Sequence, residues 1–104
     1  MIDPDLIDEG ARRIAAAAPG ARVILFGSHA RGEAGPDSDV DLLVIEPRVE
    51  DHHGEVVRLQ RLLAPLRLPA DVIVVSEAHL EEWGDVASTM LHEALREGRV
   101  LAQA

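Results

Sequence analysis

The sequence predicts a single mixed α/β domain in which helices flank a sheet of three or four strands. The chain has 104 residues, which is the length of one domain. Three short runs rich in Val, Ile and Leu have the length of buried strands. Around these runs, apolar residues recur at the spacing of a helix face. We therefore expect residues 1–104 to form one domain, whose strand order the patterns do not reveal.

The first half of the chain predicts a helix followed by two strands. Asp3 and Pro4 suit the N-cap and first turn of a helix, which Pro19 and Gly20 would end. Residues 27–39 contain several turn-forming residues, so we expect a glycine-rich turn between the two strands. These strands are expected at residues 22–26 and 40–45.

The second half predicts one further strand among three helices. Apolar residues at helical spacing indicate the first and last of these helices. Ser76 suits an N-cap, and Gly98 suits a C-cap. The expected elements are a helix at residues 50–66, a strand at 70–75, a short helix from Ser76 to Trp83 and a last helix at 85–97.

The composition limits the possible functions. The net charge is −9, from 19 acidic and 10 basic residues, and every basic residue is Arg. Such a chain lacks the clustered cations that stable non-specific nucleic-acid binding needs. The absence of Cys excludes disulfides and thiolate metal sites, and the absence of Lys excludes a P-loop lysine. The longest apolar runs are about five residues, against the roughly 18 that span a bilayer, so we expect a cytoplasmic protein with no membrane partner.

Two acidic residues mark the second expected strand. Side chains alternate along a strand, so Asp39 and Asp41 should point to the same face, with Cα atoms about 7 Å apart. Two carboxylates at this spacing repel each other unless a cation lies between them. Mg²⁺ is commonly bound by a few carboxylates together with substrate phosphates. The pair therefore predicts a magnesium site.

The turn before this pair suits a phosphate. Gly27 allows the backbone to approach a ligand closely, and Ser28 adds a hydroxyl donor. A phosphate-binding turn beside a metal-binding carboxylate pair is what phosphoryl or nucleotidyl transfer requires. Each feature alone is typical of an ordinary turn or of solvated acids, and their combination favours the functional interpretation.

A third acid begins the third expected strand. If that strand lies beside the second, Asp71 faces the carboxylate pair. It could then bind a metal ion and accept a proton from an attacking hydroxyl. The alternative is that Asp71 only caps the turn that precedes it.

Residues 27–44, GSHARGEAGPDSDVDLLV, resemble the signature of the DNA polymerase beta-like nucleotidyltransferases, which is Gly-Ser, ten residues and then Asp-x-Asp. The small size resembles the minimal nucleotidyltransferases (MNT), many of which are antitoxins paired with a HEPN ribonuclease toxin. This resemblance implies a nucleotidyltransferase fold and transfer of AMP from ATP, with two Mg²⁺ ions, to a tyrosine hydroxyl of the HEPN partner. It implies that Asp39, Asp41 and Asp71 bind the metals and carry out catalysis. It also implies that Gly27 and Ser28 hold the phosphates of the nucleotide.

Two further residues of this segment have two interpretations each. Arg31 suits phosphate oxygens, because a guanidinium group matches their geometry, but it equally suits an ion pair with Glu33. Ser38 either orients the neighbouring carboxylate or is a plain turn serine. We include Arg31 and Ser38 among the expected nucleotide-binding residues. His52 and His53 would point about 100° apart on a helix, which is typical of a solvated helix start rather than a metal site.

Two other functions are compatible with the sequence. The acidic chain could neutralise a basic ribonuclease by docking on it, without catalysis. A small-molecule nucleotidyltransferase would share the signature, but such enzymes generally carry additional helical sequence for the acceptor. We therefore expect an antitoxin that modifies its partner, with docking alone as the main alternative.

Overall fold

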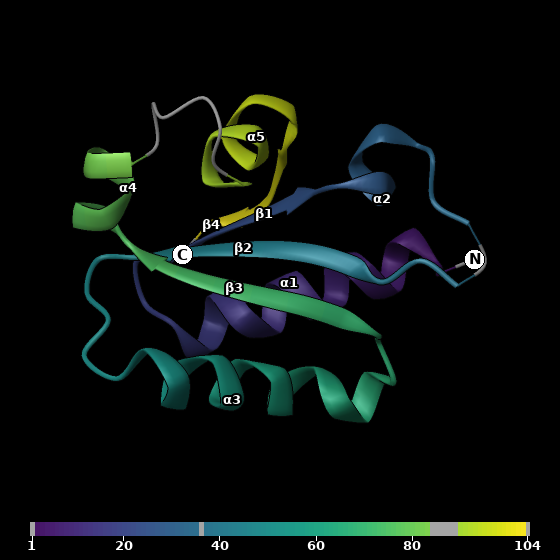
Figure 1. Cartoon of the computed structure of the whole chain (residues 1–104). Helices are drawn as coiled ribbons and strands as arrows, with labels where there is room; N and C mark the ends of the chain where they lie inside the picture. Colours follow the sequence, from purple (N-terminus) through teal and green to yellow (C-terminus); the bar gives the residue numbers. More distant parts are fainter. Residues whose placement is uncertain (1, 36, 84–89, 104) are drawn as a thin grey trace.

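The computed structural model describes residues 2–35, 37–83 and 90–103 and shows an α+β domain built on a four-stranded mixed sheet (Figure 1). The order of the strands across the sheet is β3-β2-β1-β4. β1 is antiparallel to both of its neighbours, whereas β2 and β3 are parallel. The strands are β1 (Arg22–Phe26), β2 (Val40–Glu46), β3 (Ala70–Ser76) and β4 (Arg99–Gln103). The predicted fold class, a mixed sheet flanked by helices, is confirmed.

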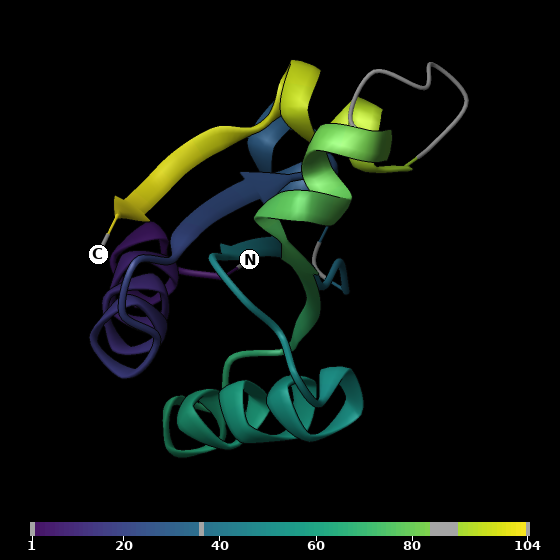
Figure 2. The ribbon, with the colours of Figure 1, turned by 90° about the vertical axis from the view of Figure 1, so that its left-hand side faces the viewer.

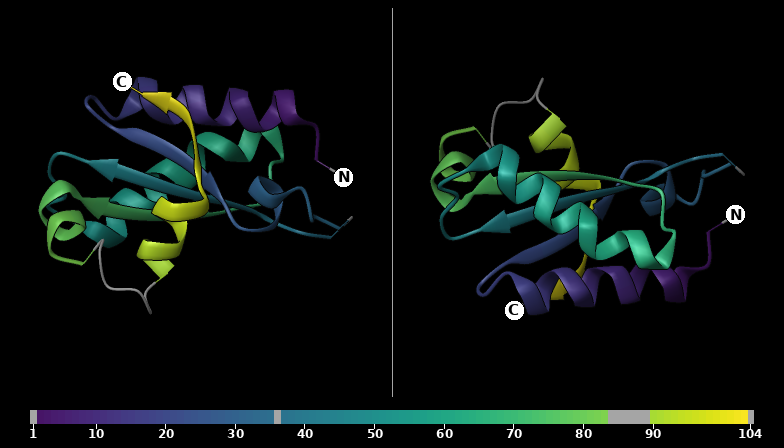
Figure 3. Two further views of the ribbon diagram at one scale, coloured as in Figure 1. Left: turned by 90° about the horizontal axis from the view of Figure 1, so that it is seen from above. Right: turned by 90° about the horizontal axis from the view of Figure 1, so that it is seen from below.

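The helices cover the two faces of the sheet unequally. α1 (Pro4–Ala17) and α3 (His52–Leu63) lie along one face, below the sheet in Figure 1. α4 (Glu77–Trp83) and α5 (Met90–Glu97) lie on the opposite face, as the turned view in Figure 2 also shows. The one-turn helix α2 (Ser28–Arg31) follows β1 directly. Seen from above, neither α4 nor α5 lies over the beginning of β2 and β3 (Figure 3, left).

The core is aliphatic and lies on both sides of the sheet, because the central strands alternate their side chains between the two faces. On the face of α1 and α3, the strands β1 and β2 contribute Val23, Leu25, Val40, Leu42 and Val44. On the opposite face they contribute Ile24, Phe26, Leu43 and Ile45, which pack with Leu91 and Ala94 of α5. Asp41 lies on this second face as well, because it is two residues from Leu43 along β2.

Helix caps agree with the sequence prediction. The Asp3 carboxylate accepts a hydrogen bond of 2.9 Å from the Asp5 N–H group, and Pro4 occupies the first turn of α1. The Ser76 hydroxyl accepts a hydrogen bond of 3.2 Å from the His79 N–H group at the beginning of α4. Gly98 follows α5, where an added Cβ would collide with the Ala94 carbonyl.

Several element boundaries differ from those expected. α3 begins at His52 rather than at residue 50, and the last three residues of the expected helix form the 3-10 helix Ala64–Leu66. Two elements were not predicted from the sequence. These are α2, which lies within the glycine-rich turn, and β4, which follows Gly98. Of the expected last helix, residues 85–89 lie outside the described residues. Among the residues that the structure describes, no helix has both the length and the apolar character needed to cross a membrane.

Candidate active site

The structure brings two of the three predicted acids together on adjacent strands. β2 and β3 are parallel, and their register pairs Asp41 directly with Asp71. Paired residues of neighbouring strands point to the same face, and this face is the one that carries Leu43 and Ile73. The condition set for Asp71 in the sequence analysis, that its strand lies beside the second, is therefore met. Asp39 lies two residues before Asp41 and is exposed, as is Asp71.

Gly27 lies against the Asp41 carboxylate. It follows Phe26, which is the partner of Asp41 in the pairing of β1 with β2. Its φ of 75° is in the region that favours glycine, and an added Cβ would collide with Oδ2 of Asp41. Ser28 then begins α2, in which the N–H groups of Ala30 and Arg31 bond to the Gly27 carbonyl at 3.1 Å. Only glycine allows the turn and the carboxylate to be this close.

A set of hydrogen bonds holds the loop that precedes the acidic pair. The ring nitrogen Nε2 of His29 lies 3.0 Å from the Ser38 carbonyl oxygen, which ties this loop to α2. The Ser38 hydroxyl accepts a hydrogen bond of 2.9 Å from the Gly35 N–H group. Val40 then donates to the Pro69 carbonyl at 2.9 Å, where β2 and β3 begin to pair. Ser38 is thus a turn serine in this structure, and its predicted contact with a nucleotide stays a prediction.

Arg31 forms the ion pair with Glu33 that its alternative interpretation named, and a second ion pair with Glu97 that the sequence analysis did not predict. Its guanidinium group lies 3.2 Å from the Glu33 carboxylate and 3.3 Å from the Glu97 carboxylate. Glu97 is the last residue of α5, so this contact joins two helices that are far apart in the sequence. The guanidinium group nevertheless lies close enough to the acids that its positive charge counteracts the rise in the pKa of Asp41.

The electrostatics of the site disfavour the ionised form of Asp41 in the absence of a bound cation. Burial first, and then the negative charges of Asp71 and Asp39, raise the pKa of Asp41 above its ordinary value. The charges of His29 and Arg31 act in the opposite direction. A cation bound here would relieve the repulsion between the carboxylates, and carboxylate oxygens are the ligands that Mg²⁺ prefers. Among the described residues, however, no group of three His, Asp or Glu side chains is gathered closely enough to hold one metal ion.

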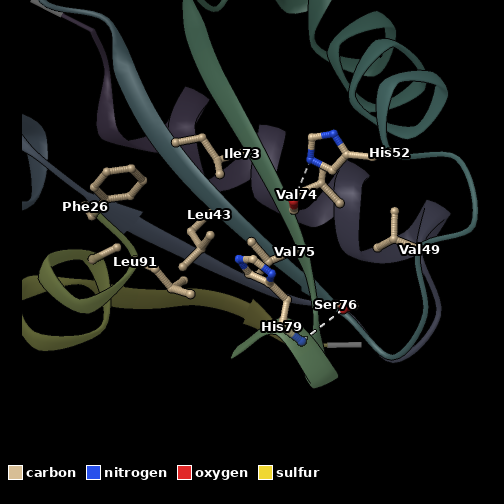
Figure 4. A pocket seen from close by; sticks show the side chains of 11 residues that line it. Phe26, Leu43, Val49, His52, Ile73, Val74, Val75, Ser76, His79 and Leu91 are labelled. Carbon is tan, nitrogen blue, oxygen red and sulfur yellow. Dashed lines mark hydrogen bonds between the residues drawn. The ribbon is translucent and has the colours of Figure 1, made fainter. Parts of the chain in front are cut away.

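An apolar pocket continues the acidic site along the same face of the sheet. Its volume is about 460 Å³, and Figure 4 shows the side chains that line it. Phe26 and Leu43 line the pocket and flank Asp41, one across the strand pair and one along the strand. The sequence analysis did not name this pocket. Its signal was present, because Leu43, Ile73 and Val75 follow the two acids at the period of a strand face.

His52 is exposed at the beginning of α3, as the sequence analysis expected, and it also has a hydrogen-bond partner. Its Nε2 atom lies 2.9 Å from the Val74 carbonyl oxygen, on the open edge of β3. The bond satisfies a backbone group that has no neighbouring strand to pair with. His53 is exposed, as expected.

Solved structures share this fold. A chain from a toxin–antitoxin crystal structure with AMP-PNP is 23% identical, with a TM-score of 0.67, and the match covers 93% of this chain and 73% of that chain. A mutant form of the toxin–antitoxin MntA–HpeT is 16% identical, with a TM-score of 0.63 and coverages of 93% and 73%. A tri-AMPylated Shewanella oneidensis HEPN toxin in complex with MNT antitoxin gives 17% identity, a TM-score of 0.59 and coverages of 96% and 72%. No curated protein shows significant sequence similarity to the chain.

The mixed sheet, with acids on two adjacent strands and a Gly-Ser turn against one of them, defines the class as a nucleotidyltransferase-like α+β domain. The model of the nucleotidyltransferase domain family matches residues 7–98. The chain therefore belongs to the nucleotidyltransferase domain family, as the signature at residues 27–44 predicted.

Proposed function

We propose that this chain is a minimal nucleotidyltransferase that transfers AMP from ATP to a tyrosine hydroxyl group of a HEPN ribonuclease toxin and thereby acts as the antitoxin of that toxin. The observation that carries the proposal is the contact of Gly27 with Asp41 beside the Asp41–Asp71 pair. This arrangement places a turn suited to phosphates against paired carboxylates. The fold that the chain shares with a chain from the complex of a tri-AMPylated HEPN toxin with MNT antitoxin supports the choice of partner and of transferred group.

The reaction assigns a role to each residue of the site. The acceptor hydroxyl oxygen attacks the α-phosphorus of ATP, the bond to the β-phosphate oxygen breaks, and pyrophosphate leaves. Asp71 is exposed and accepts the proton of the attacking hydroxyl. Mg²⁺ is commonly held by one or two carboxylates together with substrate phosphates, so Asp39, Asp41 and Asp71 would hold Mg²⁺ without all three surrounding one ion. The metal would neutralise the charge that develops on the phosphate oxygens.

The nucleotide itself is held by the turn and its neighbours. Gly27 and Ser28 face the phosphates, and the backbone at Gly27 can approach them because it carries no side chain. Arg31 exchanges one of its two carboxylate partners for a phosphate oxygen, which its exposed position allows. Ser38 keeps the loop before the acids in place through its hydrogen bond with Gly35, and we include it in the proposed nucleotide site because it directly precedes Asp39.

Docking without catalysis is the second candidate function. The net charge of −9 favours association with a basic ribonuclease, and no set of three metal-binding side chains is gathered among the described residues. Docking does not require a nucleotide, whereas nucleotidyl transfer does. The two functions are therefore separable by adding or withholding ATP.

A ribonuclease assay makes this separation. The proposed HEPN partner would be incubated with this chain, with and without ATP and Mg²⁺, and then separated from it before RNA cleavage is measured. Nucleotidyl transfer predicts that the freed toxin stays inactive only after incubation with ATP, and that Asp39→Asn abolishes this effect. Docking predicts that the freed toxin regains full activity in every case.

A further inference from the structure

The apolar pocket has no role in the transfer step itself. It is lined on the α5 side by Phe26, Leu43, Ile73, Val75 and Leu91, which are apolar, and it ends in the polar groups of Ser76 and His79. Its volume of about 460 Å³ falls within the range of pockets that bind small molecules, roughly 300–1,000 Å³. The pocket is thus large enough for part of a nucleotide.

The strand register places this pocket directly beside the acids. Ile73 and Val75 follow Asp71 by two and four residues on the same face of β3, which corresponds to about 7 and 13 Å along the strand. Phe26 pairs with Asp41 and precedes Gly27, so the aromatic ring borders both the acidic pair and the turn. A ligand that has its phosphates at the turn can therefore reach the pocket along the face of the sheet that carries Asp41 and Asp71.

The chemistry of the two regions matches the two ends of a nucleotide. The acids and the turn suit a charged triphosphate with its metal ions, and the pocket suits a planar, apolar group. Figure 4 shows Phe26, Leu43 and Leu91 close together at one end of the pocket, where they are nearly buried. Ile73 and Val75 are partly exposed beside them, and they supply the apolar surface against which a ring can pack. Ser76 and His79 lie at the opposite end, where they can supply polar contacts to the edge of a ring.

We propose that this pocket binds the base of the nucleotide substrate. The site then binds a nucleotide more tightly than it binds a triphosphate without a base. This inference rests on the proposed function, because it assumes that the phosphates lie at Gly27. The continuity of the pocket with the acidic pair favours the base over a side chain of the partner protein, which would have to share the space with the nucleotide.

Filling the pocket tests the inference. Val75→Phe adds bulk to the pocket, and Ile73→Thr makes its wall smaller and more polar. Both residues are only partly buried, and neither is assigned to catalysis. Val100→Phe is the matched control, because Val100 is 53% exposed on β4 and does not line the pocket. Calorimetry with Mg²⁺ would compare the binding of AMP-PNP with that of inorganic tripolyphosphate.

We expect Val75→Phe to weaken the binding of AMP-PNP by about tenfold or more and Ile73→Thr to weaken it by several-fold, roughly the cost of overpacking or altering an apolar site. Binding of tripolyphosphate should be unchanged in both variants, which also shows that they are folded. Unchanged binding of AMP-PNP, or an equal loss for both ligands, would overturn the inference. If Val75→Phe weakened only the binding of the partner protein, the occupant would be a partner side chain and the inference would be wrong. If the unmodified chain bound neither ligand, the proposed function itself would fail.

Discussion

Glu46 is a buried carboxyl group whose proton should make the stability of the domain depend on pH. It ends β2, is only 7% exposed, and its Oε2 atom has no hydrogen-bond partner among the described residues. It shares a hydrogen bond with Glu55, which Arg58 holds through two contacts of 2.7 Å. Burial first, and then the hydrogen bond and charge of Glu55, raise the pKa of Glu46 to about 7. Hydrogen bonds from Arg58 and Glu46 lower the pKa of Glu55 to about 2.

The direction of the pH effect follows from proton binding. Between the ordinary pKa of 4.5 and about 7, the folded chain keeps a proton on Glu46 that the unfolded chain has lost. The free energy of unfolding therefore falls as pH rises through this range, by about 3 kcal/mol in full. The stabilisation from Glu55 has the opposite sign: it is present above its ordinary pKa and is lost as pH falls toward 2. Between pH 5 and pH 8.5, the change with pH that this pair causes in the free energy of unfolding therefore comes from Glu46.

The assay is urea unfolding, followed by circular dichroism, of the unmodified chain and of Glu46→Gln. We expect the unmodified chain to lose most of this stabilisation between about pH 5 and about pH 8.5, whereas Glu46→Gln has no such proton to lose. Glu93→Gln is the control, because Glu93 is an exposed acid on α5. If Glu46→Gln showed the same pH dependence as the unmodified chain and the control, the account of this buried pair would be refuted.

Three further predictions concern the active site. Gly27→Ala should lower nucleotidyl transfer by on the order of 100-fold by displacing a carboxylate, as measured by initial rates. Gly32→Ala is the control, because Gly32 has a similar φ of 74° but open space for a Cβ. This variant should lower the free energy of unfolding by about 1 kcal/mol and leave the transfer rate nearly unchanged. Equal transfer rates in the two variants would contradict the collision with Asp41. His29→Leu should lower kcat about tenfold, and His29→Gln should restore most of it if a hydrogen bond to the loop is the reason, so failure of this rescue would count against a positioning role. Arg31→Ala should raise the KM for ATP about tenfold, whereas Arg96→Ala, which removes another arginine beside Glu97, should not; similar effects of both would exclude a specific phosphate contact.

Local patterns were sufficient to predict most of the sheet and the shared strand face of Asp39 and Asp41. Alternation placed Asp41 on one face of β2, and the apolar runs predicted three of the strands within one residue at each end. The pairing of Asp41 with Asp71 needed the additional fact that β2 and β3 are neighbours. A sequence pattern does not contain strand order, so this part of the site could only be stated as a condition.

Contacts between distant residues account for what the sequence did not predict. Arg31 pairs with Glu97, which is 66 positions away, and Glu46 meets Glu55 only because β2 and α3 pack together. β4 is a short edge strand whose partner, β1, lies more than 70 residues earlier in the chain. Such elements form because a neighbour supplies their hydrogen bonds, and their own sequences carry little signal.

The most direct test of nucleotidyl transfer is the intact mass of the HEPN partner after incubation with this chain, ATP and Mg²⁺. We predict that the partner gains one or more AMP units, that Asp41→Asn abolishes this gain, and that Asp37→Asn, a change at an exposed acid in the same loop, preserves it. No gain in mass, or a gain that persists in Asp41→Asn, would contradict the proposed function.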